Sequence, residues 1–258
     1  MSLEQRQPKR LRERPAAVLF DLDNTLYAYD PAHAAGMAAT RKKACTLVGC
    51  TDEAFEQFFD GARREVKAQL GSNGAAHSRL LYFHRMVEML GMKSQPLLAL
   101  DLEQTYWRTF LGSAKLFPEV KEFLDELRSA GVITGLVTDL TTQIQFRKLI
   151  YFGLDHSFDY VVTSEEAGTE KPSAAPYVLM RRKLGETTGP IWMIGDNGET
   201  DIAGSREHLS AVTLQKRHAG VKIEGGERAA DVVFDEFGEL RRAFATTGAA
   251  RAQMLSLR

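Results

Sequence analysis

The sequence predicts an α/β protein, in which a doubly wound, parallel, Rossmann-like sheet forms the core and an all-helical cap domain is inserted into it. Short, fully apolar runs recur along the chain, as expected for strands that are buried on both faces. From Val120 onward these runs alternate with amphipathic stretches. More than a hundred residues without an obvious strand separate the first two runs, and this long segment predicts the cap.

Six apolar runs are the predicted strands. The first, residues 16–20 (AAVLF), ends in an acidic, polar turn. The others are residues 132–137 (VITGLV), 160–163 (YVVT), 191–194 (IWMI), 211–214 (AVTL) and 232–234 (VVF). Between them, Val120, Phe123, Leu124 and Leu127 follow the i, i+3, i+4, i+7 spacing of a helix that packs on a sheet, and residues 144–149 follow it in part.

The strand-free segment predicts four helices, at residues 31–49, 52–70, 75–90 and 96–111, with glycines between them. Thr51 is a suitable N-cap for the second helix. Four helices inserted at one crossover cannot all cover the sheet. We therefore expect a helical cap domain at residues 29–116 and an α/β core domain at residues 16–28 and 117–246.

Both ends of the chain are expected to lie outside these domains. Residues 1–15 contain five basic side chains and no apolar stretch of the kind found in signal peptides. We expect a disordered basic tail there. Residues 247–258 are expected to form a C-terminal tail or a frayed helix.

Composition excludes several classes of function. The 33 Lys and Arg residues balance 34 Asp and Glu residues, so there is no general electrostatic attraction to nucleic acid or to an anionic membrane. No apolar run approaches the ~20 residues of a membrane span. Cys45 and Cys50 cannot form a disulfide framework. We expect a cytoplasmic monomer or homodimer with neither a nucleic-acid nor a membrane partner.

Polar side chains follow four of the predicted strands. DLDNTL (residues 21–26) follows the first strand, and Thr138 with Asp139 follows the second. Lys171 comes shortly after the third, and GDNGETD (residues 195–201) ends the fourth. Because the carboxyl ends of parallel strands meet at one edge of such a sheet, these groups are expected to lie together.

Carboxylates, a hydroxyl and an amine at one edge predict phosphoryl chemistry with a divalent metal. Clustered carboxylates repel one another unless a cation lies among them, and Mg²⁺ is the natural partner for oxygen ligands. Lys171 and the Thr138 hydroxyl would then face an anion. Asp21 is suited to act as a nucleophile, and Asp23 is suited to protonate a leaving alcohol.

These motifs resemble those of the haloacid dehalogenase superfamily of phosphohydrolases over the whole core. DLDNTL is similar to the first motif (DxDxT), Thr138 to the second, Lys171 to the third and GDNGETD to the fourth (GDxxxxD). Their order and their placement after strands also agree. The DNTLY stretch (residues 23–27) is similar to the branch that contains pyrimidine 5′-nucleotidases and small sugar-phosphate phosphatases.

The resemblance implies a catalytic role for each motif. Asp21 would attack phosphorus and form an aspartyl-phosphate. Asp23 would act first as the general acid and then as the base that activates water. Thr138 would hold the phosphate, and Lys171 would orient the nucleophile and screen charge.

The resemblance also implies a metal site. Asp21, Asp196 and the backbone carbonyl of Asp23 would bind Mg²⁺, and Asp201 would support these ligands or the lysine. Thr25 is expected to be a supporting residue that bonds to the backbone of its own turn.

Asp139 departs from the family pattern, in which Asn often follows the second-motif Ser or Thr. A further carboxylate beside a phosphate would be unfavourable. We expect the Asp139 side chain to turn away and to cap the helix that begins near Thr141.

His77 and Arg79 are the candidate substrate-binding residues of the cap. They open a predicted helix, and a helix start can direct such side chains at an anionic or polar substrate. The alternative is that both lie on the surface of the cap, with the arginine solvated.

The predicted function is Mg-dependent hydrolysis of a small phosphomonoester, a nucleotide 5′-monophosphate or a sugar phosphate. A phosphomutase or phosphotransferase remains an alternative, as does a non-catalytic phosphate-binding protein. Dehalogenases of the family lack an acid at the position of Asp23, which disfavours that branch. The phosphonate-cleaving branch needs a cap lysine, and nothing distinguishes Lys42, Lys43 or Lys67 for that role.

Overall fold

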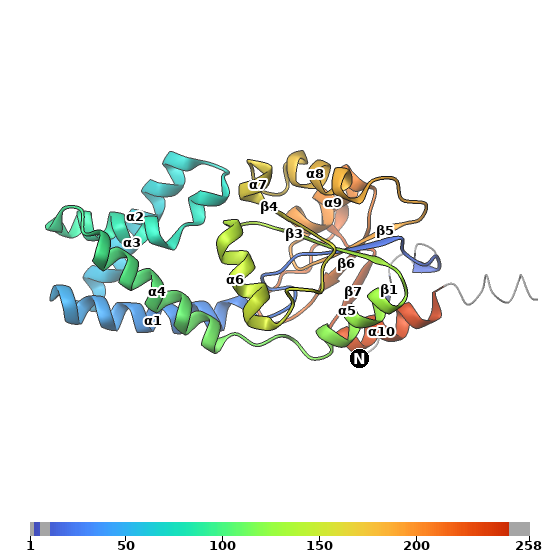
Figure 1. The fold of residues 1–258 in the computed structure, drawn as a ribbon, viewed down its shortest axis with the longest axis horizontal. Coiled ribbons are helices and arrows are strands. Elements are labelled where there is room, and N and C mark those ends of the chain that lie inside the picture. Colours follow the sequence, from blue (N-terminus) through green and yellow to red (C-terminus); the bar gives the residue numbers. More distant parts are fainter. Residues whose placement is uncertain (1–2, 6–10, 248–258) are drawn as a thin grey trace, which may run out of the picture.

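The computed structural model describes residues 3–5 and 11–247, and their centre is a seven-stranded sheet (Figure 1). The strand order is β1-β7-β6-β5-β2-β3-β4, and every neighbouring pair is parallel except β1 and β7. The bounds are β1 (Glu4–Gln5), β2 (Ala17–Phe20), β3 (Ile133–Thr138), β4 (Tyr160–Thr163), β5 (Ile191–Gly195), β6 (Val212–Lys216) and β7 (Val232–Phe234). All six predicted strands are therefore present, and the predicted α/β fold class is confirmed.

Helices cover both faces of the sheet, because alternate side chains of each buried strand point to opposite sides. Val18 and Phe20 of β2 pack into one apolar cluster, while Ala17 and Leu19 pack into another. The first cluster includes side chains of α5 (Val120–Ser129), α6 (Thr142–Phe152) and α10 (Phe237–Thr246). The second includes side chains of α8 (Ala174–Leu184) and α9 (Gly204–Leu209), and the short helix α7 (Ser164–Ala167) follows β4.

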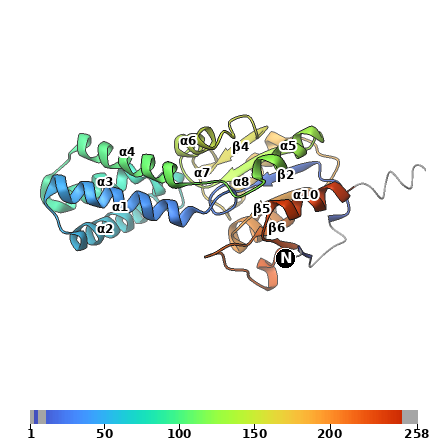
Figure 2. The same ribbon diagram turned by 90° about the horizontal axis from the view of Figure 1, so that it is seen from below.

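Of the helices between β2 and β3, four pack on one another at one end of the molecule (Figures 1 and 2). They are α1 (Tyr29–Val48), α2 (Asp52–Leu70), α3 (Arg79–Val87) and α4 (Pro96–Ser113), and we refer to them as the cap. The Thr51 hydroxyl accepts a hydrogen bond from the Ala54 amide at 3.2 Å, so the predicted N-cap of α2 is confirmed.

The third predicted cap helix, residues 75–90, is interrupted. A 3₁₀ turn, Gly74–His77, comes first, and α3 begins only after Ser78. Ser78 has an extended backbone, and its hydroxyl accepts a hydrogen bond from the Leu81 amide at 3.3 Å. A serine in this conformation starts a new helix, which places His77 and Arg79 on different elements.

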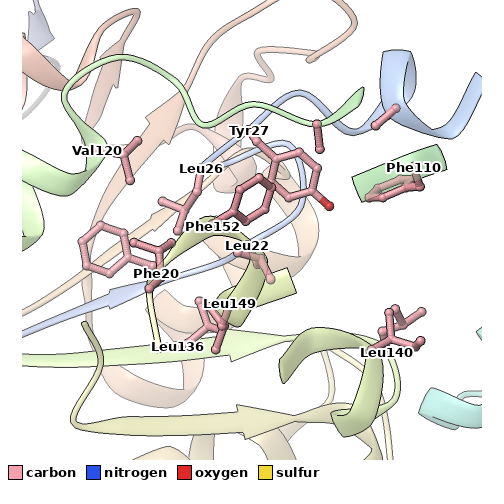
Figure 3. Close-up of a cluster of buried hydrophobic side chains, with 14 of the residues drawn as sticks. Phe20, Leu22, Leu26, Tyr27, Phe110, Val120, Leu136, Leu140, Leu149 and Phe152 are labelled. Carbon is pink, nitrogen blue, oxygen red and sulfur yellow. The ribbon is translucent and has the colours of Figure 1, made fainter. Parts of the chain in front are cut away.

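Two segments that run side by side join the cap to the sheet. The Phe117 amide donates to the Leu26 carbonyl at 2.8 Å, and Tyr27 forms a β-bridge with Leu116. Tyr27 is fully buried and contacts both Phe110 of the cap and Phe152 of α6 (Figure 3). The turn that follows β2 is therefore packed against core and cap at once.

The structure describes residues 3–5 and 11–15 of the expected N-terminal tail, and these residues depart from the expectation. Glu4 and Gln5 pair with Val233 and Val232 of β7, and Leu11 is buried. The expectation of a disordered tail is wrong for these residues, because β7 would otherwise present an unpaired edge. Residues 248–258 of the expected C-terminal tail lie outside the described residues. Among the helices that the structure describes, none has both the length and the apolar composition of a membrane span.

Candidate active site

The motif residues meet at the carboxyl ends of β2, β3 and β5. β2 lies between β3 and β5, so the order of the strands reverses there, and ligands of open α/β sheets bind at such a point. Asp21 directly follows β2, and its amide donates to the Ile194 carbonyl of β5 at 2.9 Å. A cleft of about 210 Å³ opens at this edge, lined by Asp21, Asp23, Asn24, Thr138, Asp139, Lys171, Asp196, Asn197, Thr200 and Asp201.

Lys171 connects two of the carboxylates. Its Nζ lies 2.7 Å from Asp21 Oδ1 and 2.7 Å from Asp201 Oδ1, and it donates to the Val137 carbonyl at 3.0 Å. The lysine and both aspartates are buried. Burial opposes the charge on Lys171, but the adjacent Asp201 and Asp21 carboxylates raise its pKa well above the usual value. The ammonium therefore screens the charge of Asp21 and fixes its orientation.

Three carboxylates lie close enough to hold one metal ion. Oxygen atoms of Asp21, Asp196 and Asp201 all lie within 4.8 Å of one another. Burial raises the pKa of Asp21 to about 7, and burial with the charges of Asp201 and Asp21 raises the pKa of Asp196 to about 8. Carboxylates that resist ionisation in this way are stabilised by a divalent cation, so the donor set suits a hard metal.

Asp196 is the carboxylate of this group that has most need of a cation. Lys171 forms salt bridges with Asp21 and Asp201, whereas no salt bridge reaches Asp196 among residues 3–5 and 11–247. Gly195 allows Asp201 to approach, since a Cβ at Gly195 would lie 2.2 Å from the Asp201 Cβ. Asp201 Oδ2 also accepts from the Asn197 amide at 3.1 Å, which holds the loop that presents Asp196.

Thr25 supports the carboxylates directly. Its hydroxyl lies 3.3 Å from Asp21 Oδ2 and 3.4 Å from Asp196 Oδ1. The expected bond to the backbone of its own turn is therefore wrong. The side chain is fully buried beside two carboxylates, which are stronger acceptors than a turn carbonyl.

Thr138 ends β3 with its hydroxyl at the cleft. Its Oγ1 accepts a hydrogen bond from Gln145 Nε2 at 2.7 Å, and the same nitrogen donates to the Asp139 carbonyl at 2.7 Å. Because the hydroxyl oxygen is used as an acceptor, its proton is free for a bound anion. Gln145 was not predicted as a site residue.

Asp139 does not cap α6. Its Oδ1 accepts from the Lys171 amide at 3.0 Å, whereas the amide of Thr142 in the first turn of α6 donates to Glu165 Oε2 at 2.8 Å. The expected capping role is therefore wrong. Asp139 instead fixes the backbone that carries Lys171, and burial raises its pKa above the usual value.

Asp23 has two partners that the sequence did not reveal. Lys148 Nζ lies 2.7 Å from each of its carboxylate oxygens, and the Tyr27 hydroxyl donates to Oδ1. Lys148 belongs to α6 and is fully buried. A sequence signal did exist, since Lys148 is four residues from both Ile144 and Phe152 on the buried face of that helix.

The two cap candidates lie close to the core in different ways. His77 Nε2 is 2.6 Å from Glu170 Oε1, in the segment just before Lys171. Arg79 donates to the His77 carbonyl at 3.0 Å and to the Tyr29 hydroxyl at 2.6 Å. Both line a cavity of about 140 Å³ with Trp107 of the cap and Thr141 of the core. Neither is a free surface side chain.

A comparison with protein families identifies this arrangement. The family model described as haloacid dehalogenase-like hydrolase matches residues 15–208. The chain belongs to this family. The match includes all four motifs predicted for this chain, from Asp21 to Asp201.

Relatives of known activity refine the family assignment. The chain is 41% identical over 231 residues to a ribulose-1,5-bisphosphate 5-phosphatase of Halopiger xanaduensis, covering 87% of this chain and 97% of the relative. It is 32% identical over 203 residues to a glyceraldehyde 3-phosphate phosphatase of Methanopyrus kandleri, covering 78% and 83%. The predicted enzyme class, a phosphoric monoester hydrolase of the haloacid dehalogenase superfamily, is confirmed, and a non-catalytic binding protein is not supported.

Solved structures of the family share the fold. A haloacid dehalogenase-type phosphatase from Thermococcus onnurineus aligns with a TM-score of 0.64 at 21% identity, covering 90% of this chain and 98% of that one. A 2-haloacid dehalogenase from Pseudomonas syringae pv. Tomato aligns with a TM-score of 0.68 at 22% identity, covering 89% and 97%.

Proposed function

We propose that this enzyme hydrolyses a small phosphorylated sugar by transferring the phosphoryl group first to Asp21 and then to water, with Mg²⁺ as the metal. The observation that supports the proposal most strongly is the position of Asp21. One of its oxygens is 2.7 Å from the Lys171 ammonium, and its carboxylate lies within 4.8 Å of an oxygen of Asp196. A carboxylate held between an amine and a candidate metal site is an oriented nucleophile.

In the first half of the reaction, Asp21 attacks phosphorus and the bond from phosphorus to the sugar oxygen breaks. The bonding electrons move to that oxygen, which takes a proton from Asp23 and leaves as a neutral alcohol. The Thr138 hydroxyl donates to a phosphate oxygen, and Lys171 lowers the negative charge around the phosphoryl group. In the second half, water attacks phosphorus and gives a proton to Asp23. The bond between phosphorus and the Asp21 oxygen breaks, its electrons return to the Asp21 carboxylate, and inorganic phosphate leaves.

Asp21, Asp196 and the Asp23 backbone carbonyl would hold Mg²⁺, and Asp201 would keep Lys171 and the Asn197 loop in place. When bound, the ion supplies positive charge that offsets the charge on the phosphate oxygens. The acidic donor set and the absence of a salt-bridge partner for Asp196 among the described residues support this assignment.

The size of the site and the relatives support a small sugar phosphate as substrate. The cleft of about 210 Å³ matches a phosphate group with a few further atoms. Cap side chains line the neighbouring cavity, which disfavours large phosphorylated proteins. The names of the two relatives identify them as phosphatases of ribulose 1,5-bisphosphate and glyceraldehyde 3-phosphate.

Arg79 is the cap residue that we assign to the sugar side of the substrate. Its guanidinium forms no salt bridge with a carboxylate in the described part of the chain, and its Nε is buried without a hydrogen-bond partner. The Tyr82 and Tyr106 rings lie 5.4 and 5.3 Å away. A cation held by aromatic rings without a carboxylate suits a polar or anionic group of the substrate.

The test is a panel of phosphate esters at equal concentration, with release of inorganic phosphate measured in Mg²⁺ and in EDTA. The panel contains ribulose 1,5-bisphosphate, glyceraldehyde 3-phosphate, a pyrimidine nucleoside 5′-monophosphate and p-nitrophenyl phosphate. We expect stoichiometric phosphate without an added acceptor, loss of activity in EDTA, and the highest kcat/KM for a sugar phosphate.

Three results would contradict the proposal. A higher kcat/KM for the nucleotide would overturn the sugar assignment. Phosphate transfer that requires an added alcohol would favour the phosphomutase or phosphotransferase alternative. Equal activity in EDTA would exclude the metal-dependent mechanism.

A further inference from the structure

Lys148 is a buried cation whose purpose the fold alone does not explain. It has no solvent exposure, yet it lies on α6 at a position where an apolar side chain would pack. Removing an ammonium from water is unfavourable, and replacing a buried ion pair with apolar residues is often neutral or stabilising. A fully buried lysine beside an active-site acid therefore suggests a role in the reaction.

The contacts of Lys148 converge on Asp23. Lys148 Nζ lies 2.7 Å from Oδ1 and 2.7 Å from Oδ2, and no other carboxylate forms a salt bridge with it among the described residues. The Tyr27 hydroxyl donates to Oδ1. The Asp23 side chain nevertheless stays 28% exposed and lines the cleft. Lys148 thus contacts both oxygens of the carboxyl group, while part of the Asp23 side chain remains exposed at the cleft.

Aromatic rings of core and cap surround the same ammonium. Its Nζ lies 5.6 Å from the ring centre of Phe110, 5.7 Å from Trp107 and 5.8 Å from Tyr29, all residues of cap helices, and 6.0 Å from Tyr27. Figure 3 shows Phe110 of the cap facing Tyr27 at this junction. The rings can interact with the ammonium through their π faces but carry no negative charge, so Asp23 is the one salt-bridge partner of Lys148 among the described residues.

We propose that Lys148 is a positioning residue for the general acid: it holds the Asp23 carboxyl group in the orientation from which the leaving oxygen receives its proton. The inference rests on the proposed function, because it assigns Lys148 to the step in which the ester bond breaks. In that step the electron pair of the phosphorus–oxygen bond moves to the leaving oxygen, and the proton of Asp23 neutralises it.

The dependence of the rate on the leaving group separates positioning from a purely structural role. Phenyl phosphate and p-nitrophenyl phosphate have the same charge and nearly the same shape, but phenolate is the poorer leaving group and needs protonation more. The parameter kcat/KM reports the steps up to the departure of the leaving group. We therefore measure kcat/KM for both esters in the holoenzyme with Mg²⁺ and in its Lys148→Met variant.

We expect Lys148→Met to lower kcat/KM for phenyl phosphate about 100-fold, since general acid catalysis contributes roughly 10²–10⁴-fold. The loss for p-nitrophenyl phosphate should be at least ~10-fold smaller, because that leaving group needs little protonation. Methionine matches the length of lysine and suits the aromatic surroundings, so the variant should fold. Lys43→Met is the matched control, because Lys43 pairs with Asp101 inside the cap, away from Asp23.

A second measurement tests whether Lys148 acts through Asp23. In an Asp23→Asn background, Lys148→Met should change kcat/KM for phenyl phosphate less than ~3-fold. Two results would overturn the positioning role and leave the proposed phosphatase function intact. One is a double variant whose loss in kcat/KM equals the product of the losses in the two single variants. The other is an equal loss for the two esters in Lys148→Met. A wild-type enzyme that is inactive toward both aryl esters and toward the sugar phosphates of the panel would instead overturn the proposed function, and this inference with it.

Discussion

At the scale of single residues, the site depends on how four carboxylates share two lysine ammonium groups. Lys171 pairs with Asp21 and Asp201, and Lys148 pairs with Asp23, so Asp196 remains without a salt-bridge partner among the described residues. Burial and neighbouring charge raise the pKa of Asp21 to about 7 and that of Asp196 to about 8. Because these carboxylates hold their protons more tightly in the folded protein than in the unfolded one, the free energy of unfolding depends on pH. A metal ion that binds the same carboxylates competes with those protons.

The linkage predicts how pH changes the stability of the metal-free enzyme. Unfolded Asp has a pKa near 4, so between about pH 4 and pH 8 the folded state holds protons that the unfolded state has released. The free energy of unfolding of the metal-free enzyme should therefore fall as the pH rises through this range. Mg²⁺ must displace these protons, so its stabilising effect should be larger at pH 8 than at pH 6.

Thermal unfolding in EDTA and in Mg²⁺, at pH 6 and pH 8, measures both effects. The Asp196→Asn variant is the control, because it keeps the other titrating groups, including His33, whose pKa burial lowers to about 4. The variant should lose most of the shift caused by Mg²⁺ and show a weaker fall in melting temperature with pH. A Mg²⁺ shift that is equal in both proteins would contradict the assignment of Asp196 as a ligand.

Single residues also show where the sequence was sufficient. Asp21, Asp196 and Lys171 could be predicted because each follows a strand, and parallel strand ends meet at one edge. Gln145 could not be recognised as a site residue, because its contact with Thr138 depends on how α6 is rotated against the sheet. Lys148 gave a signal in its position on the apolar face of that helix, but its partner Asp23 could not be predicted from that position. The orientation of the Asp139 side chain was not predictable either, because it is set by a hydrogen bond from the Lys171 amide, which is distant in the sequence.

At the scale of elements, α2 and α3 bring cationic side chains of the cap close enough to influence one another. Arg79 opens α3, and burial together with the charge of Arg63 lowers the pKa of Lys67 on α2. The sequence predicted all four cap helices, because glycines and the Thr51 cap separate them. It did not predict the break at Ser78, since a serine inside an apolar periodic stretch reads equally well as a solvent-facing helical residue.

The position of Arg79 in the cap predicts that Arg79→Met lowers kcat/KM for some substrates more than for others. A hydrogen bond to a charged group contributes about 1.5–3 kcal/mol, so kcat/KM for a sugar phosphate should fall about 10–100-fold, mainly through KM. Hydrolysis of p-nitrophenyl phosphate, which lacks sugar hydroxyls and a second anionic group, should change less than ~3-fold. Steady-state kinetics on both esters gives the comparison.

Arg41→Met is the matched control for Arg79, because Arg41 also belongs to the cap but pairs with Asp52 and Glu56. It should leave kcat/KM for both esters unchanged. Equal losses for the two esters in Arg79→Met would mean that Arg79 supports the cap rather than contacting the sugar.

At the scale of the whole molecule, the candidate site lies at the carboxyl ends of strands in the sheet, and the four cap helices form one end of the molecule (Figures 1 and 2). The junction at Tyr27 makes the two parts interdependent, since that residue contacts Phe110, Phe152 and Asp23. Strand alternation and the strand-free segment were enough to predict this plan. The packing of the cap on the cleft was not predictable, because it depends on contacts between distant segments.

The central claim is that Asp21 accepts the phosphoryl group, and kcat/KM of the Asp21→Asn variant with p-nitrophenyl phosphate and Mg²⁺ tests it most directly. Asparagine keeps the size of the side chain but cannot form the acyl phosphate. With melting temperature and circular dichroism confirming the fold, the account predicts a loss of at least ~10³-fold. A variant that retains kcat/KM within ~10-fold of the wild-type enzyme would contradict it.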